Sequence, residues 1–595
     1  MKRVLLLILC GLMLITTQLT FSQDTVQQPV PTRIPPTPVP QTITNLEETL
    51  PSQSAIARIR EDGVMNVGVL YNNPPFSQYN IRGLISGYDA DLANSLATAW
   101  GVQTNFVQVT RDPEEVAAML ERGDVDIVIG ALPHRREYDP LVEFSQTYYM
   151  NRQAMMVLSS SDIESPNQLA DRRVGVVVAS PAENAANRWL IRSGVSAEIQ
   201  TYLTLDQAYV ALAAGEIDGI IDSEHRLVRV ASIRPDLTRM LSESIEQEPY
   251  AVSMLRQDVS MRTLVNSTLH YLTRIGRMDE IQQVHFPGER YDDIVIWKNT
   301  PTDSPALDQF SVDLTFPPRY VVPRIQGGEP LRVAGIYGDG ATFSQQNLDS
   351  FHRQMFEALV GRWGGTVEFI PLSAGNPLEL VANGQADIAL GVEPDWEWAN
   401  RVDFTNPYLV HGYRLMSRVG ENVVGFADLS SDVLLIPSND GLAGDRAREI
   451  TQFLGARIEI LSQSEDALAS LLLDNEESEA DAVFGDSLTL LPIAWANVDR
   501  LALTLASDGT GRWYNSSYMP GAECAATVTC RPLQMALATP LNDLEFHLLV
   551  EYTLQEMMLD GTMSRLWHLV MLPEDIPTFE IWPGSSIYLG YRLGS

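Results

Sequence analysis

The stretch "GDVDIVIGALP" at residues 123–133 returns later in the chain as "GQADIALGVEP" at residues 384–394. Three further pairs of segments match in the same order and at a similar separation: "VEFSQTYY" (142–149) with "VDFTNPYL" (402–409), "GEIDGIID" (215–222) with "SEADAVFGD" (478–486), and "GRMDEI" (276–281) with "GTMSRL" (561–566). This separation is far longer than the period of a solenoid repeat, which indicates that a whole domain has been duplicated. We expect the first copy at residues 54–290 and the second copy at residues 328–575.

Each copy alternates strand-like and helix-like segments. In the first copy, the apolar runs at 64–71, 126–132 and 172–180 predict buried strands. The segments 89–101 and 113–123 predict helices, because both end in a glycine and the second begins with proline and two glutamates. Strands that alternate with helices form largely parallel sheets with helices on both faces. Such an α/β architecture binds its ligands beyond the carboxyl ends of the strands.

The composition of the 595-residue chain is that of a folded protein with several domains, since 45% of the residues are hydrophobic and 20% are charged. It carries 76 acidic and 41 basic residues, which gives a formal net charge of −35. Phosphate backbones and anionic membranes repel such a chain, so we expect no nucleic-acid partner. The lysines are Lys2 and Lys298, which leaves almost no candidate for a phosphate-binding or Schiff-base lysine.

Residues 1–22 have the pattern of a secretory signal peptide. Lys2 and Arg3 form a basic start, an apolar run follows, and small residues predict cleavage before Gln23. The run is too short to span a bilayer, which needs about 20 residues. Cys10 lies within the apolar run and not after it, which disfavours a lipid-modified cysteine. We therefore expect an exported, extracytoplasmic protein, in the periplasm or at the cell surface.

Three segments lie outside the signal peptide and the two copies. Residues 23–53 are rich in proline, threonine and glutamine, which predicts an extended, semi-rigid tether. Residues 291–327 are expected to form an inter-domain linker and residues 576–595 a C-terminal tail. Within the second copy, Cys524 and Cys530 stand close together with no histidine nearby. In an exported protein this pair predicts a local disulfide in preference to a zinc site.

Both copies resemble family 3 extracellular solute-binding proteins, which have the type 2 periplasmic-binding fold and serve ABC importers of polar amino acids. In the first copy the resemblance rests on "NNPPFSQYNIRGLISGYDADLA" (72–93), on "GDVDIVIGAL" followed by "VEFSQTYY", and on "AAGEIDGIID" (213–222). The second copy keeps "ADIALG", "VDFTNPY", "ADAVFGD" and the closing segment "LQEMMLDGTMSRLW" (554–567). In its opening segment, "VAGIYGDGATFS" (333–344) replaces the glycine-rich stretch of the first copy.

The resemblance implies two tandem type 2 domains, each built from two α/β lobes that are joined by crossover strands around a cleft. The first lobe of each domain is then discontinuous, with residues 55–149 and 250–290 in the first copy and 328–410 and 515–575 in the second. A ligand that contacts both lobes shifts the population toward the closed form, and a partner that recognises this form senses occupancy. The implied partners are a small-molecule ligand and an ABC permease in the membrane, and we expect a monomer.

An amino-acid ligand needs an anion site for its carboxylate, an acid for its ammonium group and an apolar or aromatic wall. The family places the carboxylate-binding arginine six residues before the phenylalanine of an F-[S/T]-x-x-Y run, where this chain has Tyr138. The resemblance therefore points to Arg135 and Arg136, just upstream, because a planar guanidinium binds a carboxylate through two hydrogen bonds. Asp222 stands nearest to the position of the family's ammonium-binding aspartate.

The second copy departs further from the family's ligand site. Asp486 falls on the ammonium-binding aspartate, but Trp398 stands at the position of the arginine and Arg401 lies on its other side. Glu393 is also close by in the sequence. This set of side chains is poorly suited to the carboxylate of an α-amino acid. The alternatives are a cation, a sugar-like or aromatic ligand on the tryptophan, or no ligand.

Further candidates lie at helix starts and at the walls of the clefts. Ser180, which precedes a proline, has the pattern of an N-cap, and the free N–H groups behind a cap suit a carboxylate. Ser438 is its counterpart in the second copy. The remaining candidates for ligand contact are Asn73, Phe76, Asp339 and Phe343. The two phenylalanines are equally candidates for the core, and Asn73 replaces an aromatic residue that the family often has.

The preferred interpretation is a binding protein with no catalytic residue, no cofactor and no metal. An alternative is an enzyme on the same fold, since some relatives of the family are exported dehydratases, and Glu393 or His134 is then the candidate acid or base. The chain has no GxSxG and no HExxH motif, which leaves hydrolase chemistry without a visible nucleophile or metal set. A third interpretation is a sensory module that signals through a partner.

Overall fold

The computed structural model describes residues 51, 53–289, 294, 296–421, 423, 425–429, 433–455, 457–473, 480–504, 514 and 533–571, without the side chain of Phe453. The expected signal peptide, nearly all of the expected tether, the pair Cys524 and Cys530, and the expected C-terminal tail lie outside these residues. Within the described part of the chain, no helix has the length and apolar character needed to cross a membrane.

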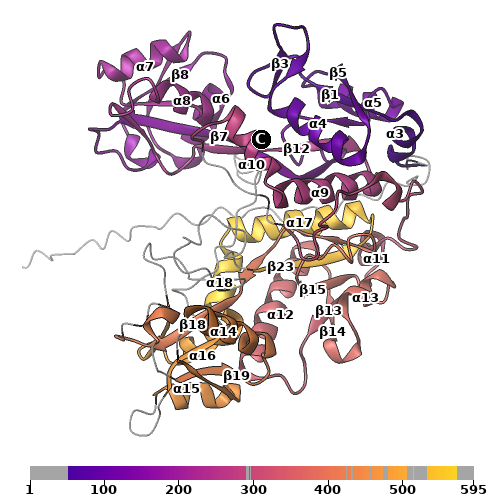
Figure 1. Cartoon of the computed structure of the whole chain (residues 1–595), viewed down its shortest axis with the longest axis vertical. Coiled ribbons are helices and arrows are strands. Elements are labelled where there is room, and N and C mark those ends of the chain that lie inside the picture. Colours follow the sequence, from indigo (N-terminus) through magenta and orange to yellow (C-terminus); the bar gives the residue numbers. More distant parts are fainter. Residues whose placement is uncertain are drawn as a thin grey trace, which may run out of the picture. The chain divides into compact units, whose positions relative to one another are not determined.

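The first copy opens with a lobe in which helices cover a sheet (Figure 1). Its elements before the crossover are α3 (Ile56–Asp62), β1 (Val64–Val69), α4 (Tyr88–Trp100), β5 (Gln103–Gln108), α5 (Pro113–Arg122) and β6 (Ile127–Val128). A small separate sheet holds β2 (Asn72–Asn73), β3 (Ser77–Tyr79) and β4 (Ile85–Ser86). The chain returns to this lobe with α9 (Val259–Arg274) and α10 (Arg277–His285), so the lobe is discontinuous, as expected.

Two long strands join the lobes of the first copy. They are β7 (Val142–Leu158) and β12 (Glu246–Leu255), which pair with each other in antiparallel fashion. The second lobe contains β8 (Arg173–Val177), α6 (Pro181–Ser193), β9 (Glu198–Tyr202), α7 (Leu205–Ala213), β10 (Gly219–Ser223), α8 (Glu224–Ala231) and β11 (Thr238–Met240). Because both crossover strands continue from one lobe into the other, one sheet with the order β5-β1-β6-β12-β7-β10-β8-β9 passes through both lobes.

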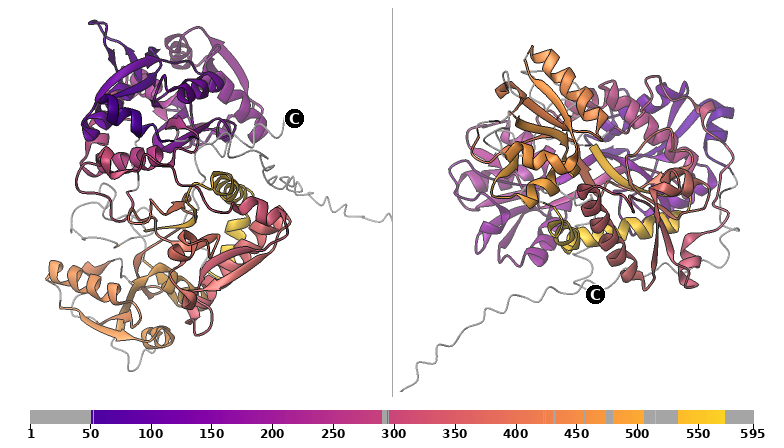
Figure 2. Two further views of the ribbon diagram at one scale, coloured as in Figure 1. Left: turned by 90° about the vertical axis from the view of Figure 1, so that its right-hand side faces the viewer. Right: turned by 90° about the horizontal axis from the view of Figure 1, so that it is seen from below.

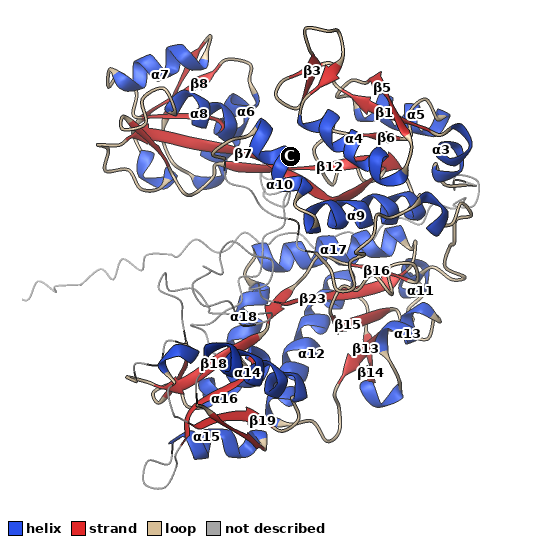
Figure 3. Ribbon diagram, in the orientation of Figure 1, coloured by secondary structure: helices blue, strands red, loops and turns tan. Residues whose placement is uncertain are grey.

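The second copy repeats this arrangement. Its first lobe holds α11 (Val321–Gln326), β13 (Leu331–Ile336), α12 (Phe343–Trp363), β14 (Val367–Pro371), α13 (Pro377–Ala382), β15 (Ile388–Val392), β16 (Val402–Phe404), β17 (Leu409–His411), β23 (Leu533–Pro540), α17 (Leu544–Leu559) and α18 (Thr562–His568). Its second lobe holds β18 (Tyr413–Arg418), β19 (Val433–Pro437), α14 (Gly441–Leu454), β20 (Glu459–Gln463), α15 (Glu465–Leu473), β21 (Ala480–Asp486), α16 (Ser487–Ala496) and β22 (Leu501–Leu503). Figures 2 and 3 show helices around the strands of each lobe.

The sheets of the two copies have corresponding strand orders. The order β14-β13-β15-β23-β16 matches β5-β1-β6-β12-β7, and β21-β19-β20 matches β10-β8-β9. The expected α/β fold with two lobes in each copy is thus confirmed. The first crossover differs, because β7 is continuous whereas its counterpart is divided into β16, β17 and β18. Pro407 has no N–H for a sheet, and Gly412 has a φ of +152°, so the chain is interrupted at both points.

The aspartate that the repeated segments "VDI" (125–127) and "ADI" (386–388) share has a structural role. The carboxylate of Asp126 accepts the backbone N–H of Asn66 at 2.8 Å, and the carboxylate of Asp387 accepts that of Arg332 at 2.9 Å. Each aspartate thereby holds its strand against the neighbouring strand of the sheet. The second lobes use the same device, since Arg173 donates to Asp218 and Val433 donates to Asp481, both at 2.9 Å. These four acids are explained by the fold and are not ligand candidates.

The strand expected at residues 126–132 is shorter than predicted, because β6 covers only Ile127–Val128. Gly130 has a φ of +74°, and a Cβ at this position would lie 1.9 Å from Oδ2 of Asp89. Asp89 is fully buried at the start of α4, where it accepts a hydrogen bond from Tyr148 at 3.1 Å. The chain therefore leaves the extended conformation to make room for this carboxyl group.

Candidate functional site

The candidate residues of the first copy come from both lobes. Arg135 follows β6 in the first lobe, and Asp222 lies in β10 of the second lobe. The crossover strands β7 and β12 connect the two lobes, so a hinge motion would change the distance between these two residues. The two candidates thus belong to different lobes of the first copy.

The guanidinium group of Arg135 has one firm partner. Its Nη2 donates to Oε1 of Glu248 on β12 at 2.5 Å, and the amide of Asn151 donates to the other oxygen of Glu248 at 3.4 Å. Burial disfavours the charged form of Arg135, but the carboxylate of Glu248 outweighs this effect and raises the pKa of Arg135. Nε of Arg135 is buried and has no hydrogen-bond partner among the described residues. A single donor of this guanidinium, the Nε–H group, is thus left for another acceptor.

The neighbouring Arg136 points elsewhere. Its guanidinium carbon lies 3.7 Å from the ring centroid of Tyr552, and its Nη1 lies 3.5 Å from Oε1 of Glu556. Both partners belong to α17 of the second copy. The two consecutive arginines that the sequence offers as carboxylate ligands are therefore divided between the cleft and a contact with the other copy.

Asp222 is a buried acid with one unsatisfied oxygen. Its Oδ1 accepts hydrogen bonds from Arg226 at 3.0 Å and from the backbone N–H of Ser223 at 2.7 Å. Its Oδ2 has no partner among the described residues. Burial raises the pKa of Asp222, and Arg226 opposes this rise only in part. A cationic group that reached Oδ2 would stabilise the ionised carboxylate.

Phe76 belongs to an aromatic cluster and is only 4% exposed. Its ring centroid lies 5.1 Å from that of Tyr149 and 5.2 Å from that of Phe286, and 6.0 Å from that of His225 in the second lobe. Of the two hypotheses for Phe76, these contacts favour the core. Asn73, which belongs to β2 of the small sheet, accepts a hydrogen bond from Arg111 at 3.1 Å.

The segment after α10 is a part of this cluster that sequence reasoning missed. Phe286 stacks on Tyr149 at a centroid distance of 4.7 Å, and Tyr149 donates a hydrogen bond to Glu289 at 2.7 Å. Burial raises the pKa of Glu289 to about 7 and lowers the pKa of His225 to about 4. The segment lies shortly after the matching "GRMDEI" (276–281). Its sequence alone does not indicate that it contacts both lobes.

The two expected helix caps have different outcomes. Ser180 caps α6, since its hydroxyl accepts the N–H of Glu183 at 3.3 Å. In the second copy, α14 is capped by Asp440, whose carboxylate accepts the N–H of Ala443 at 2.9 Å. Ser438 is exposed and lies two residues before this cap. The cap is thus an acid in the second copy, which changes the charge at the start of this helix.

Asp486 of the second copy is paired with a histidine. Its Oδ2 lies 2.8 Å from Nδ1 of His411 at the end of β17, and its Oδ1 accepts the N–H of Leu488 at 2.8 Å. Burial opposes ionisation of both partners, but their mutual attraction outweighs it, lowering the pKa of Asp486 and raising that of His411. The acid that the resemblance assigns to the ligand's ammonium group is therefore paired with a histidine of this chain.

Other polar groups surround this pair. Tyr413 donates to Asp440 at 3.5 Å, and burial raises the pKa of Asp440, with a smaller contribution from the charge of Asp486. Burial likewise raises the pKa of Glu393, against the charges of Lys298 and His411. His411 and Tyr413 were missed from the sequence, because their relevance depends on the division of the crossover strand that brings them to Asp486. Asp440, the N-cap of α14, was missed as well.

The other candidates of the second copy are less closely tied to this pair. One face of Trp398 is covered by Arg401, whose guanidinium carbon lies 4.5 Å from the ring centroid. Phe343 is the first residue of α12 and is 44% exposed, so it does not belong to the core. Asp339 lies in an exposed turn between β13 and α12. It is Asp349, on α12, that fixes this turn by accepting the N–H groups of Tyr337 and Gly338 at 2.9 Å.

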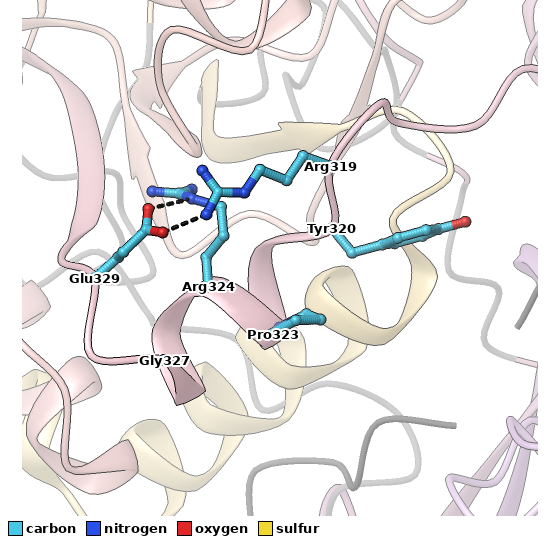
Figure 4. Close-up of a pocket in the computed structure, with 6 residues that line it drawn as sticks. All are labelled: Arg319, Tyr320, Pro323, Arg324, Gly327 and Glu329. Carbon is cyan, nitrogen blue, oxygen red and sulfur yellow. Dashed lines mark hydrogen bonds and ion pairs between the residues drawn. The ribbon is translucent and has the colours of Figure 1, made fainter. Parts of the chain in front are cut away.

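A separate pocket of about 430 Å³ lies beside α11. Its lining residues are Arg319, Tyr320, Pro323, Arg324, Gly327 and Glu329. Figure 4 shows the guanidinium groups of Arg319 and Arg324 meeting the carboxylate of Glu329, with 3.0 Å between Nε of Arg324 and the nearer oxygen. None of the candidate site residues lines this pocket, and its charges are already paired.

A family model for bacterial extracellular solute-binding proteins, family 3, matches residues 65–288 and 341–568, which together make up most of the chain. Among individual proteins, the glutamine-binding protein of Geobacillus stearothermophilus is 25% identical over 212 residues, covering 35% of this chain and 79% of that protein. The L-arginine-binding protein of Pseudomonas aeruginosa is 22% identical over 241 residues, covering 39% of this chain and 90% of that protein. Among solved structures, an ancestral cationic amino acid solute-binding protein is 26% identical over 39% of this chain and 100% of that chain, with a TM-score of 0.34.

Proposed function

Because the chain belongs to the bacterial extracellular solute-binding proteins of family 3, we propose that it captures a small polar solute, an amino acid or a similar molecule, by lobe closure and delivers it to an ABC importer. A solute-binding role is common to the relatives that the chain matches, and two of them carry glutamine and L-arginine in their names. The same family membership supports a place outside the cytoplasm. The ligand, the closure and the importer are our proposals for this chain.

One observation carries the choice of ligand class. Arg135 and Asp222 stand on different lobes of the first copy, and each keeps one buried polar atom without a partner among the described residues. An α-amino acid offers a carboxylate for the free Nε of Arg135 and an ammonium group for the free Oδ2 of Asp222. Buried polar atoms without partners are costly, so a ligand that satisfies both is favoured over one that satisfies neither.

The second copy supplies a contrast. His411 already neutralises Asp486, and Trp398 stands where the family has its arginine. An amino acid that entered this cleft would have to displace His411 from a partly buried ion pair without gaining a guanidinium for its carboxylate. We therefore assign amino-acid binding to the first copy alone.

Thermal unfolding of the full chain tests this assignment. We expect one or more of the proteinogenic amino acids to raise the unfolding temperature, because a ligand at about 100 times its dissociation constant adds about 2.7 kcal/mol to the stability of the form that binds it. Asp222→Asn should abolish the shift. The matched variant Asp486→Asn changes the acid at the end of the corresponding strand β21 of the second copy, and it should retain the shift. The opposite pattern would contradict the assignment.

Two further measurements address delivery and chemistry. The ligand recovered from the protein after prolonged incubation should be chemically unchanged, whereas a converted product would favour the enzyme interpretation. Uptake of the same labelled ligand by cells should depend on the protein and fall with Asp222→Asn. Uptake that is independent of the protein would argue against delivery to an importer.

A further inference from the structure

The two copies meet through a buried ion cluster. Arg262, on α9 of the first copy, places Nη1 2.5 Å from Oε1 of Glu143 in its own copy and donates through Nη2 to Oδ1 of Asp403 in the second copy. The three side chains are 15%, 4% and 7% exposed, respectively. Glu143 and Asp403 occupy equivalent places in "VEF" and "VDF". A single cation thus joins matching residues of both copies.

Other contacts around this cluster also come in equivalent pairs. Gln257 and Asn542, with φ of +64° and +61°, precede α9 and α17, and the amide of Asn542 donates to the carbonyl oxygen of Gln257 at 3.4 Å. Asn266 and Glu551, one at the same position of each helix, accept the backbone N–H groups of Gln146 and Asn406 at 2.8 and 2.6 Å. Like surfaces therefore face each other, as in a dimer with a two-fold axis.

In the ion pairs across this contact, the basic residues nevertheless all come from the first copy and the acidic residues from the second copy. The first copy contributes Arg136, Arg256 and Arg262, and the second copy contributes Glu556, Glu545 and Asp403 as their respective partners. Nη2 of Arg256 lies 2.7 Å from Oε1 of Glu545, and the hydroxyl of Tyr552 donates to Asp139. His547 stands at the position of α17 that corresponds to Arg262. Burial lowers the pKa of His547 to about 4, so it adds no cation at neutral pH.

This separation of arginines and acids between the two surfaces affects which partner each surface can bind. Two copies of the second surface would bring Glu545 and Asp403 together without the arginines that pair them here. Arg362 of the second copy already contacts Glu556 and Asp560 of its own copy, so the cost is like-charge repulsion and unpaired buried charge. The first surface finds acids that match its three arginines on the second copy. We propose that the first-lobe surfaces of the two copies form a self-sufficient, mutually selective interaction site, a pseudo-two-fold dimer interface within one chain that holds without the covalent linker.

The proposal has a consequence for movement. Glu143 and Asp403 lie at the start of the first crossover strand of their copies. Arg262 therefore connects the two crossover strands at the ends that belong to the first lobes. The first lobes then act as a common base, and closure of either cleft moves the second lobe. This inference does not depend on which ligand either cleft takes.

Cleavage of the full chain between the copies tests the proposal. A recognition sequence for a specific protease is inserted between the exposed residues Pro318 and Arg319, and the purified protein is then cut. We expect the two fragments to remain one complex in native mass spectrometry and gel filtration at micromolar concentration. Arg262→Ala should raise their dissociation constant at least about 100-fold. Arg277→Ala, on the neighbouring α10 and facing Glu280, is the matched control and should have no effect.

A second set of variants covers the possibility that Arg262→Ala fails to fold. Arg256→Glu and Glu545→Arg, at a partly exposed pair, should each weaken the cut complex, and the double variant should restore it. Separation of the cut wild-type fragments at micromolar concentration would overturn the proposal. It would equally be overturned if the single charge reversals left the fragments as tightly bound as those of Arg277→Ala.

Discussion

Asp222 and Asp486 lie near the ends of the equivalent strands β10 and β21, one register position apart, and have different partners. Asp222 is bound by Arg226 from the following helix at 3.0 Å and keeps one oxygen free among the described residues. Asp486 is bound by His411 from the crossover strand at 2.8 Å, and its other oxygen caps α16. The two acids therefore differ in whether an oxygen is left without a partner among the described residues.

The pair of Asp486 and His411 should make stability depend on pH in a defined way. The pKa of His411 is raised in the folded protein, so its contribution is full below about 6.5 and is lost as the pH rises through the raised value. The pKa of Asp486 is lowered, so its contribution is full above about 3.8 and is lost as the pH falls through the lowered value. His411→Asn should therefore destabilise the protein most at pH values between these limits.

We expect this substitution to lower the free energy of unfolding by about 1.5–3 kcal/mol there, as for other hydrogen bonds to charged groups. The measurement is urea denaturation of wild type and variant at mildly acidic and at alkaline pH. His285→Asn is the control, because its partner Asp91 is 41% exposed and such a pair contributes about 1 kcal/mol or less. A cost of His411→Asn that is the same at both pH values would contradict the ion pair.

Gly130 should tolerate no side chain. In Gly130→Ala the new Cβ would lie 1.9 Å from the carboxyl group of Asp89, and the residue would have to adopt a φ of +74°. We expect a loss of more than about 2 kcal/mol. Gly101→Ala is the control, because it has a similar φ of +73° with no atom near the new Cβ, and it should cost about 1 kcal/mol. Equal thermal midpoints for the two variants would disprove the steric argument.

Glu551 should make the protein less stable as the pH rises. Burial raises its pKa from 4.5 to about 7, although the hydrogen bonds from Asn406 oppose this. The folded form therefore holds a proton that the unfolded form releases, and up to about 3 kcal/mol of stability is lost as the pH rises from below 4.5 through 7. Glu551→Gln removes this titration, so the urea midpoint of the variant should fall less between pH 5 and 8. The first copy carries an amide, Asn266, at the same position. A fall as large as that of wild type would refute the prediction.

The duplicated fold was predictable from the sequence, because the matching segments carry the structural acids and the apolar strands. Asp126 and Asp387 fix neighbouring strands by the same hydrogen bond, so their motif must recur wherever the fold recurs. The length of β6 was not predictable, since it depends on the contact between Gly130 and Asp89, which are far apart in the sequence.

The site was predictable only in part. Arg135 and Arg136 are neighbours in the sequence. Tertiary packing determines that Arg135 contacts Glu248 and that Arg136 contacts Tyr552 of the second copy. The division of the crossover strand brings His411 to Asp486. It depends on the backbone conformation of Gly412, which cannot be read from the sequence.

Isothermal titration calorimetry of the first cleft tests the central claim most directly. The full chain is titrated with the amino acid that gives the largest thermal shift and with the matching amine that lacks only the carboxyl group. We predict one site for the amino acid, binding at least about 10-fold weaker for the amine, and loss of this preference in Arg135→Gln, because a hydrogen bond to a charged group contributes about 1.5–3 kcal/mol. Equal affinity for both ligands, or a preference that survives Arg135→Gln, would contradict carboxylate recognition by the first copy.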